Sequence, residues 1–432
     1  MFCVSFKTPF FTNRRRQKVE ESIKHPRFQG NELKYVKEVL DSGFASSAAG
    51  SMVQRLEEAF AKKFGVKYAI TSTSGTTTLH QALAAFGVGP GDEVILPVST
   101  VISCPFAIMY TGARPVFADI DPDTFLIDPE DIKRKITFRT KAIMAVHLCG
   151  LMCDMDAIME IAGERGLYVL EDCAQSIGAK DHRGRFAGTV GQAGSFSFEN
   201  SKHISTGDGG ILITNDEKIA TRMRKFGCLG YKNVGSVTGQ VLLSRDTFQD
   251  PDYLRHDSFG WNYRLPELAA AVGLAQLERL DFFVSRRRMM ARKFLEVLQE
   301  TGCEWLVPQC RLSGYTNTCW TFAVRYEGQE GLGISWYDFR KKFMEFGGDG
   351  FYAGWPPLYK EPALKMVSDT GRFFADERKQ RLDFIGFLDH VSCPVAEKLQ
   401  SKLMHFTTNQ LTEEEMDIQA EALRKTIIHF SK

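Results

Sequence analysis

Lys202 is the residue whose surroundings most clearly suggest chemistry. The short apolar segment Gly194–Phe198 precedes it, and the glycine-rich turn Thr206–Gly210 follows it. An amine held beside a buried strand loses solvation, which lowers its pKa and lets it attack a carbonyl carbon to form a Schiff base. A lysine before glycines is also common in solvated loops, so this local pattern alone leaves both interpretations open.

Asp172 places an acid directly after a second apolar run. Tyr168–Leu170 leads through Glu171 into Asp172, at the expected carboxyl end of a strand. A carboxylate in this position could keep a pyridinium nitrogen protonated, and a protonated pyridoxal ring is an electron sink. The alternative is an aspartate that only caps a loop.

Ser74, Gly75 and Thr76 stand just before an apolar helical pattern that ends at Gly87. Small hydroxyl residues and glycine at a helix N-terminus offer free N–H groups and the positive end of the helix dipole to a phosphate. The same residues also form an ordinary N-cap. The later turn Gly207–Gly210 lacks the Lys-Ser/Thr ending of a P-loop, which excludes a nucleoside triphosphate site of that kind.

Composition excludes several classes of partner. The 432 residues have a formal net charge of +1, so the whole chain gives no reason to expect nucleic acid or an anionic membrane. No stretch approaches the roughly 18 apolar residues that span a bilayer. The basic run Arg14–Arg16 follows the apolar N-terminal residues, which is the wrong order for a signal peptide. Ten cysteines without paired spacing indicate reduced thiols in a cytoplasmic protein, and we predict no metal site.

Helical patterns and short apolar strands alternate between about residues 50 and 215. The strand-like runs are apolar continuously, as expected for strands covered by helices on both faces. This alternation predicts an α/β domain with a mostly parallel sheet, in which ligands bind beyond the carboxyl ends of the strands. The runs in question are Val94–Leu96, Val116–Ala118, Ile143–Val146 and Tyr168–Leu170.

A long helix is predicted from Pro266, at position N1, through Leu280, and the basic stretch Arg286–Arg288 after it is predicted to be a solvated helix face. Beyond about residue 290 the pattern becomes irregular, with turns expected at Gly328–Gly333 and Gly347–Gly350. We therefore predict an N-terminal extension over 1–30, a large α/β domain over 31–285, and a smaller α+β domain over 286–432.

Taken together and in chain order, these pieces resemble the pyridoxal-phosphate-dependent sugar aminotransferases of the DegT/DnrJ/StrS type, which have the fold-type I aminotransferase architecture. The resemblance extends from about Ser42 to the final helix. Its strongest blocks are Thr73–Thr76, Pro90–Val94, Asp121–Thr124, Glu171–Gln175, the segment around Lys202, and Gly260–Arg264.

The resemblance implies a homodimer that uses pyridoxal 5'-phosphate to transfer an amino group from glutamate or glutamine to a nucleotide-linked keto sugar. It implies that Lys202 forms the internal aldimine and later moves the proton, and that Asp172 pairs with the ring nitrogen. The other implied cofactor residues are Gln175 beside the ring, Ser74, Gly75, Thr76 and Ser197 at the phosphate, and Asn262 from the partner subunit.

The sequence also departs from the family pattern and leaves alternatives open. Val101 stands where an aromatic residue usually stacks on the cofactor ring, and the segments 231–258 and 347–357 could shape the substrate pocket. A dehydratase of the same family is one alternative, although dehydratases tend to have histidine at the position of Lys202. A non-catalytic regulator that retains the fold is another, although it would need neither Lys202 nor Asp172.

Overall fold

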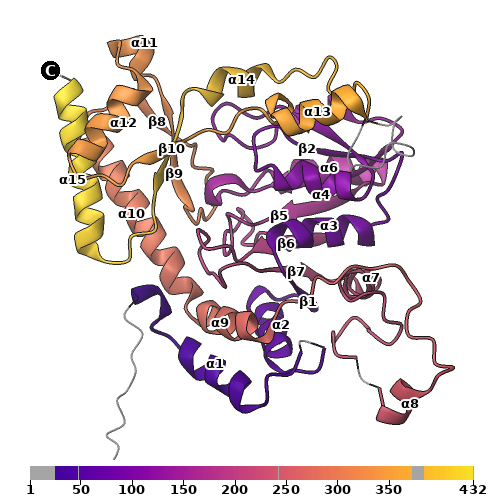
Figure 1. The fold of residues 1–432 in the computed structure, drawn as a ribbon. Coiled ribbons are helices and arrows are strands. Elements are labelled where there is room, and N and C mark those ends of the chain that lie inside the picture. Colours follow the sequence, from indigo (N-terminus) through magenta and orange to yellow (C-terminus); the bar gives the residue numbers. More distant parts are fainter. Residues whose placement is uncertain (1–24, 47, 242, 372–383, 432) are drawn as a thin grey trace, which may run out of the picture.

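A seven-stranded sheet forms the centre of the larger part of the molecule in this computed structural model, which describes residues 25–46, 48–241, 243–371 and 384–431 (Figure 1). The strand order is β1-β7-β6-β5-β4-β2-β3, and every neighbouring pair is parallel except those of β7. The strands are β1 Tyr68–Ser72, β2 Glu93–Pro97, β3 Arg114–Ala118, β4 Thr140–Val146, β5 Tyr168–Asp172, β6 Ala193–Ser197 and β7 Gly210–Thr214.

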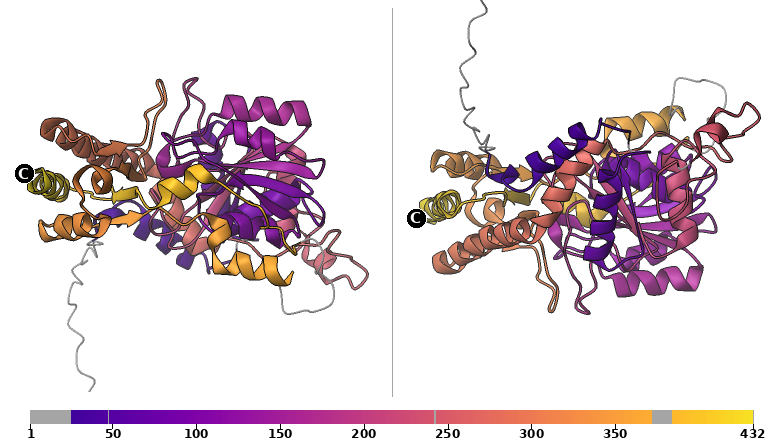
Figure 2. Two further views of the ribbon diagram at one scale, coloured as in Figure 1. Left: turned by 90° about the horizontal axis from the view of Figure 1, so that it is seen from above. Right: turned by 90° about the horizontal axis from the view of Figure 1, so that it is seen from below.

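Helices flank this sheet on both faces, which explains why its strands are apolar without alternation (Figure 2). The predicted α/β architecture with a mostly parallel sheet is confirmed. The helices of this part are η1 Pro26–Phe28, α1 Glu32–Asp41, α2 Met52–Phe64, α3 Gly75–Ala85, α4 Ser103–Tyr110, α5 Pro129–Lys135, η2 Leu148–Gly150, α6 Met155–Arg165, α7 Glu217–Gly227, α8 Arg245–Gln249 and α9 Glu267–Glu278.

A second, four-stranded antiparallel sheet lies beside the first, with the order β10-β11-β9-β8 (Figure 1). Its strands are β8 Leu306–Pro308, β9 Thr321–Tyr326, β10 Phe351–Ala353 and β11 Leu403–Thr407. The helices of the C-terminal part are α10 Leu280–Thr301, α11 Gly328–Leu332, α12 Trp336–Glu345, η3 Leu358–Lys360, α13 Pro362–Thr370, α14 Pro394–Gln400 and α15 Glu413–Phe430. A separate apolar core forms between this sheet and helices α10, α12 and α15.

Two local predictions differ from the structure. The helix expected from Pro266 is two helices, because Pro266 is an extended N-cap (ψ 145°) and the chain leaves helical geometry at Arg279 (φ −105°, ψ 9°). The turn expected at Gly328–Gly333 contains the short helix α11, which ends at Gly333 in a left-handed conformation. The predicted domain boundary at residues 285 and 286 falls inside α10. Of the predicted extension 1–30, residues 1–24 lie outside the described part of the chain.

The predicted solvated face of Arg286–Arg288 is wrong for its central residue. Arg287 is only 6% exposed, whereas Arg286 is half-buried and Arg288 is exposed. The Arg287 guanidinium donates to the carbonyl oxygens of Trp320 (2.8 Å) and Ser201 (2.8 Å). Helix α10 therefore turns this cation inward, toward the loop that contains Lys202. Within the described ranges, no helix is both long and apolar enough to cross a membrane.

Candidate active site

The predicted cofactor residues meet at one edge of the large sheet. Parallel strands β1, β5 and β6 end at this edge, and the residues at or just after their carboxyl ends are Ser74, Asp172 and Ser197. Strand β7 runs the other way and begins at the same edge, so the loop between β6 and β7 returns Lys202 to it. The site thus lies where ligands bind in open α/β sheets.

Gly210, the first residue of β7, allows the strands to close at this edge. It pairs with Ser72 of β1 on one side and with Ser197 of β6 on the other. A Cβ atom at this position would lie 2.7 Å from the carbonyl oxygen of Phe196 and 2.8 Å from that of Ser74. Only glycine fits here without a shift of the backbone, which explains why the turn Thr206–Gly210 ends in a glycine.

Lys202 is half-buried, and its amine faces an indole ring. Nζ lies 4.3 Å from the centroid of the Trp320 ring, and Trp320 is itself fixed by donating its indole N–H to the carbonyl of Ser201 (3.0 Å). Burial lowers the pKa of the Lys202 amine, while the charges of Glu199 and Asp172 act in the opposite direction. A lowered pKa leaves more of the amine free of its proton, which a nucleophilic amine requires.

Asp172 is a buried carboxylate, 3% exposed. Oδ1 accepts the backbone N–H of Ala174 (3.0 Å), and Oδ2 accepts a hydrogen bond from the thiol of Cys104 (3.3 Å). Burial raises the pKa of Asp172, and the hydrogen bonds and the nearby charge of Lys202 partly offset that rise. The structure therefore brings Lys202 and Asp172 close enough for each charge to favour the ionised form of the other.

The N-terminus of α3 forms a small cradle next to the end of β6. Within the described ranges, the backbone N–H groups of Gly75 and Thr76 have no hydrogen-bond acceptor. A Cβ atom on Gly75 would lie 2.7 Å from the Cβ of Ser197, so glycine keeps this space open. The Ser74 hydroxyl accepts the N–H of Thr77 (3.1 Å), which makes Ser74 the N-cap of the helix.

The remaining predicted positions have different surroundings. Gln175 is buried and accepts the backbone N–H of Cys149 (2.9 Å). Asn262 is exposed, and its backbone pairs with Cys228. The next residue, Tyr263, accepts the N–H of Thr73 (3.0 Å), so this segment packs beside the cradle. Val101 is 36% exposed just beyond the end of β2.

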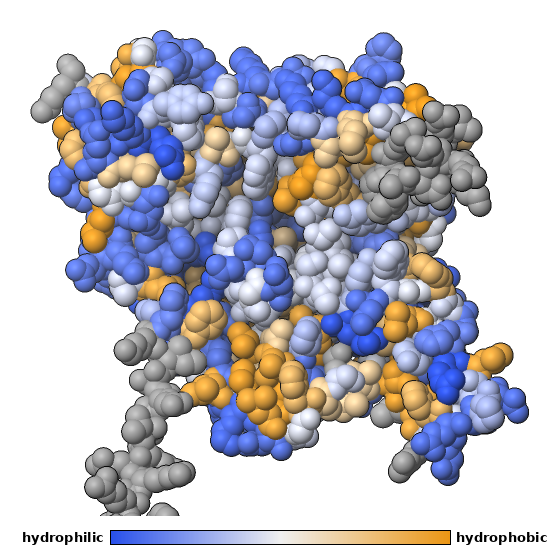
Figure 3. Space-filling model, in the orientation of Figure 1, coloured by the Kyte–Doolittle hydropathy of each residue, from blue (hydrophilic) through white to orange (hydrophobic). Residues whose placement is uncertain are grey.

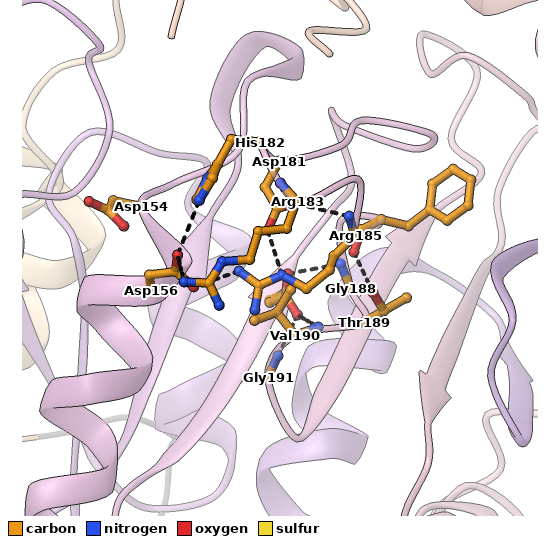
Figure 4. Close-up of polar contacts among 12 residues, drawn as sticks. Asp154, Asp156, Asp181, His182, Arg183, Arg185, Gly188, Thr189, Val190 and Gly191 are labelled. Carbon is orange, nitrogen blue, oxygen red and sulfur yellow. Dashed lines mark hydrogen bonds and ion pairs between the residues drawn. The ribbon is translucent and has the colours of Figure 1, made fainter. Parts of the chain in front are cut away.

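The loop between Asp172 and β6 is held by a polar network (Figure 4). Glu171, which points to the opposite face of β5 from Asp172, accepts the backbone N–H groups of Gly188 (2.9 Å), Val190 (2.8 Å) and Gly191 (2.6 Å). Figure 4 also shows Arg183 and Arg185 meeting Asp156, at 2.8 and 2.7 Å. These bonds fix the end of β5 and so the direction of the Asp172 side chain.

His147, Glu171 and Cys173 lie close enough together to suggest a metal site, yet their bonding favours a structural role. His147 Nδ1 accepts the backbone N–H of Cys153 (3.1 Å), which places the ring proton on Nε2, 2.9 Å from Glu171. The Glu171 carboxylate already accepts backbone N–H groups on both oxygen atoms. These hydrogen bonds occupy the atoms that a metal ion would need.

The residues of this edge fit pyridoxal phosphate. The open cradle at the start of α3 offers N–H groups and the positive end of a helix dipole to a phosphate. A buried carboxylate suits a protonated ring nitrogen, and a partly desolvated amine suits the carbonyl carbon. These residues therefore match the phosphate, the ring nitrogen and the carbonyl carbon of the cofactor.

Sequence reasoning missed several neighbours of the site. Cys104 comes from α4, Trp320 from the segment that enters β9, and Arg27 from η1; the Arg27 guanidinium donates to the carbonyl of Lys202 (2.6 Å). Nothing in the local sequence of these residues indicates such contacts. Arg287 is the exception. The basic run that contains it interrupts the apolar face of a long helix, and this pattern indicates that one of the three arginines is buried.

Known proteins similar to this chain belong to one family of aminotransferases. The model of the DegT/DnrJ/EryC1/StrS aminotransferase family matches residues 26–335. The chain is 44% identical over 269 residues to a protein named GDP-perosamine synthase from Escherichia coli O157:H7, a match covering 62% of this chain and 69% of that relative.

Solved structures are similar over most of the chain. The X-ray structure of the aminotransferase from Psychrobacter cryohalolentis has a TM-score of 0.81 at 30% identity, covering 94% of this chain and 99% of that one. A crystal structure of GDP-4-keto-6-deoxymannose-3-dehydratase with bound GDP-perosamine has a TM-score of 0.74 at 29% identity, covering 91% and 97%. The expected fold, family and cofactor are thereby confirmed: this chain belongs to the DegT/DnrJ/EryC1/StrS aminotransferase family and is a pyridoxal-phosphate-dependent enzyme.

Proposed function

We propose that this enzyme transfers an amino group from glutamate or glutamine to a keto sugar carried on a nucleotide. The observation that carries the proposal is the pair formed by Lys202 and Asp172, an amine of lowered pKa beside a buried carboxylate at the same sheet edge. The similar proteins support a sugar as substrate, since one is named GDP-perosamine synthase and another, a GDP-4-keto-6-deoxymannose-3-dehydratase, has GDP-perosamine bound in its crystal structure.

The bound cofactor supplies an electron-withdrawing ring next to the carbon that carries the amino group. Asp172 would keep the proton on the ring nitrogen, because its buried carboxylate would stabilise a positive charge at that atom. Lys202 Nζ would hold the cofactor's carbonyl carbon and would move the proton at the amino-bearing carbon. Gln175 would lie beside the ring, and Gly75, Thr76 and Ser197 would hold the phosphate.

Two other functions are less well supported. A dehydratase of the same family would be expected to have histidine in place of Lys202, and this chain keeps the lysine. A non-catalytic scaffold needs neither a buried carboxylate nor an open cradle at α3, and both are present. The combination therefore favours transamination.

The arginines support a sugar acceptor over a pair of 2-oxo acids. An enzyme for two amino acids usually holds their carboxylates with a bidentate arginine. Arg325, one candidate by type, is paired with Asp123 (3.2 Å) and Glu327 (2.8 Å), and Arg264, the other, contacts the sulfur of Cys228 (3.7 Å). The segments Tyr231–Ser258 and Tyr352–Tyr359 instead offer aromatic and hydroxyl groups to a larger polar substrate.

We also infer a homodimer in which Asn262 serves the partner's site. The Asn262 side chain is exposed and has no hydrogen bond to another described residue. Its neighbours Phe259 and Trp261 are exposed aromatic side chains, and Figure 3 shows further hydrophobic residues gathered over α1, where Leu33 and Leu40 are exposed. Exposed apolar surface of this kind suits a second copy of the chain.

We place the enzyme in the cytoplasm, since the described cysteines are all free thiols.

The proposal is tested by the two half-reactions of the purified holoenzyme. Glutamate or glutamine should convert the cofactor to its aminated form, with loss of the visible absorbance band. A nucleotide-linked keto sugar should restore that band rapidly, and pyruvate or oxaloacetate should not. Rapid return with the 2-oxo acids, and none with any nucleotide-linked or phosphorylated keto sugar, would overturn the proposed acceptor.

A further inference from the structure

A cavity of about 370 Å³ lies against the outer side of the loop that contains Lys202. Five parts of the chain meet around it: the start of the described chain, the lysine loop, helix α10, Tyr352 of β10, and the segment between β11 and α15. In Figure 1 the turn η1, in indigo, lies near the lower half of α10, where these parts converge. The cavity is large enough for a ligand of several polar groups, and none of its residues belongs to the cofactor set described above.

The lining of this cavity is strongly basic. Arg27, Arg286 and Arg287 line it together with His25 and His203, and no aspartate or glutamate among the described residues does. Arg286 lies 3.8 Å from Glu413, an exposed carboxylate, and that distance leaves the arginine only weakly paired. Within the described ranges, Arg27 and Arg287 make no ion pair with any carboxylate.

The two inner arginines donate to neutral oxygen atoms instead. Arg287 donates to the carbonyls of Ser201 (2.8 Å) and Trp320 (2.8 Å), and Arg27 donates to the carbonyls of Asn200 (2.6 Å) and Lys202 (2.6 Å). These bonds use N–H groups of both side chains. Among the described residues, the carboxylate of Glu199 acts on the charge of the half-buried Arg27, whereas no carboxylate pairs with the buried Arg287. A buried cation without a paired carboxylate is costly, so an anion bound in the cavity would be favoured.

Two hydrogen-bond acceptors on the lining have no partner among the described residues. His203 donates Nε2–H to the carbonyl of Thr318 (3.1 Å), so Nδ1 of the neutral ring is an acceptor, and it has no hydrogen bond. Oε1 of Gln410 is likewise buried without a donor. A ligand that suits this lining therefore has negative charge for the arginines and also O–H or N–H groups for the two acceptors.

We propose that this cavity binds the phosphate groups of a ligand, taken from the nucleotide-linked substrate or from free phosphate. The volume and the three arginines exceed what one carboxylate needs, and arginine is well matched to phosphate oxygens. A hydrogen phosphate or a nucleotide hydroxyl supplies the donor that His203 lacks. Assignment of the site to the substrate rests on the proposed function, whereas the phosphate site itself does not.

The test is calorimetric titration of the holoenzyme with inorganic pyrophosphate, GDP and guanosine. Arg286→Gln is the first variant, because Arg286 lines the cavity, is half-buried, and does not hold the lysine loop. Arg292→Gln is the matched control, since Arg292 is exposed on the same helix and lines a different cavity of about 160 Å³. Arg287→Lys is a second variant, because it keeps the positive charge but removes the planar N–H donors of the guanidinium group.

We expect pyrophosphate and GDP to bind the wild-type holoenzyme, guanosine to bind far more weakly, and Arg286→Gln to weaken pyrophosphate at least tenfold. Arg292→Gln should bind as the wild type does. If pyrophosphate fails to bind, or if its binding is weakened by Arg292→Gln and not by Arg286→Gln, the site is refuted.

A competition experiment identifies the source of the phosphate. If pyrophosphate competes with a nucleotide-linked keto sugar, the site belongs to the substrate; if it binds without competition, the site belongs to free phosphate. Failure of every keto sugar in the half-reaction, with pyrophosphate binding intact, would refute the proposed function and leave this site standing.

Discussion

The thiol of Cys104 donates a hydrogen bond to Oδ2 of Asp172, with Sγ and Oδ2 3.3 Å apart. Burial raises the pKa of Cys104 well above its usual value, so the sulfur keeps its proton and stays a donor. Asp172 is the last residue of strand β5, and Cys104 lies in helix α4, so the bond joins two separate elements. The ionised form of a buried carboxylate thus depends in part on a cysteine that has no nucleophilic role.

Cys104→Ala should shift the pH dependence of pyridoxal phosphate binding to the cofactor-free protein. The bound ring needs Asp172 ionised, and burial already raises the pKa of this carboxyl group. Binding therefore weakens as the pH falls through that pKa, and loss of the donor raises the pKa further. We expect the acid limb to move upward by about 0.7 pH unit, the equivalent of one hydrogen bond of ~1 kcal/mol. Cys104→Ser keeps a donor and should restore the wild-type profile; identical profiles for the two variants would contradict this role.

Lys202→Ala should abolish transamination while the protein still binds pyridoxal phosphate. The cradle at α3 and Asp172 remain, but no amine is left to hold the carbonyl carbon. We expect turnover below about one-thousandth of the wild-type value and no cofactor retained on the chain after borohydride treatment, measured by absorbance and mass. Lys218→Ala, which changes an exposed lysine of α7, is the control and should behave as wild type. Full activity in Lys202→Ala would exclude Lys202 as the cofactor-binding lysine.

Asp172→Asn keeps the shape of the side chain and removes its charge. Each lost pKa unit on the ring nitrogen corresponds to about 1.4 kcal/mol, so two units predict a decrease in turnover of about a hundredfold. Melting temperature should change little, because a buried carboxylate is replaced by a neutral amide. Asp369→Asn, on the exposed side of α13, is the control. Turnover within a factor of about two of the wild type would refute the role of Asp172 in holding the ring proton.

Glu171→Gln should act mainly by lowering the free energy of unfolding. The carboxylate accepts three backbone N–H groups, and an amide nitrogen would face at least one of these donors. We expect the free energy of unfolding to fall by about 3 kcal/mol, measured by denaturant titration. Asp156→Asn, in α6 at the half-buried ion pairs with Arg183 and Arg185 of this loop, should cost less than about 1 kcal/mol. Equal losses in the two variants would show that Glu171 does not anchor the loop.

Heterodimers test whether Asn262 acts across a subunit interface. One subunit has Lys202→Ala and the other has Asn262→Ala, and each homodimer should be impaired. If Asn262 serves the partner, the mixed dimer has one intact site and should recover about half of the wild-type activity. Verified mixed dimers without recovered activity would place Asn262 in the site of its own chain.

Local sequence was enough to locate strands β2 to β5 of the large sheet and the two main chemical groups, but it did not identify β1. Apolar runs without alternation identify strands buried on both faces, and the acid and the amine follow such runs directly. The resemblance of ordered blocks then indicated the family, which the comparisons confirm. Gln175 and Asn262 came only from that resemblance, because a polar residue in a loop has no local pattern that distinguishes it.

Only the tertiary structure decided which distant side chains surround these groups. The Cys104 thiol reaches Asp172, and the Arg27 guanidinium reaches the carbonyl of Lys202, across 68 and 175 residues of sequence. The run Arg286–Arg288 shows the limit most clearly: its three members are the same residue type, yet only Arg287 is buried. Periodicity determines which residues share a helix face, whereas the packing of that helix against other elements determines what the face meets. Sequence alone therefore specified most of the parallel strands, the lysine and the acid, and folding determined the partners of the lysine and the acid, their pKa shifts and the basic cavity beside them.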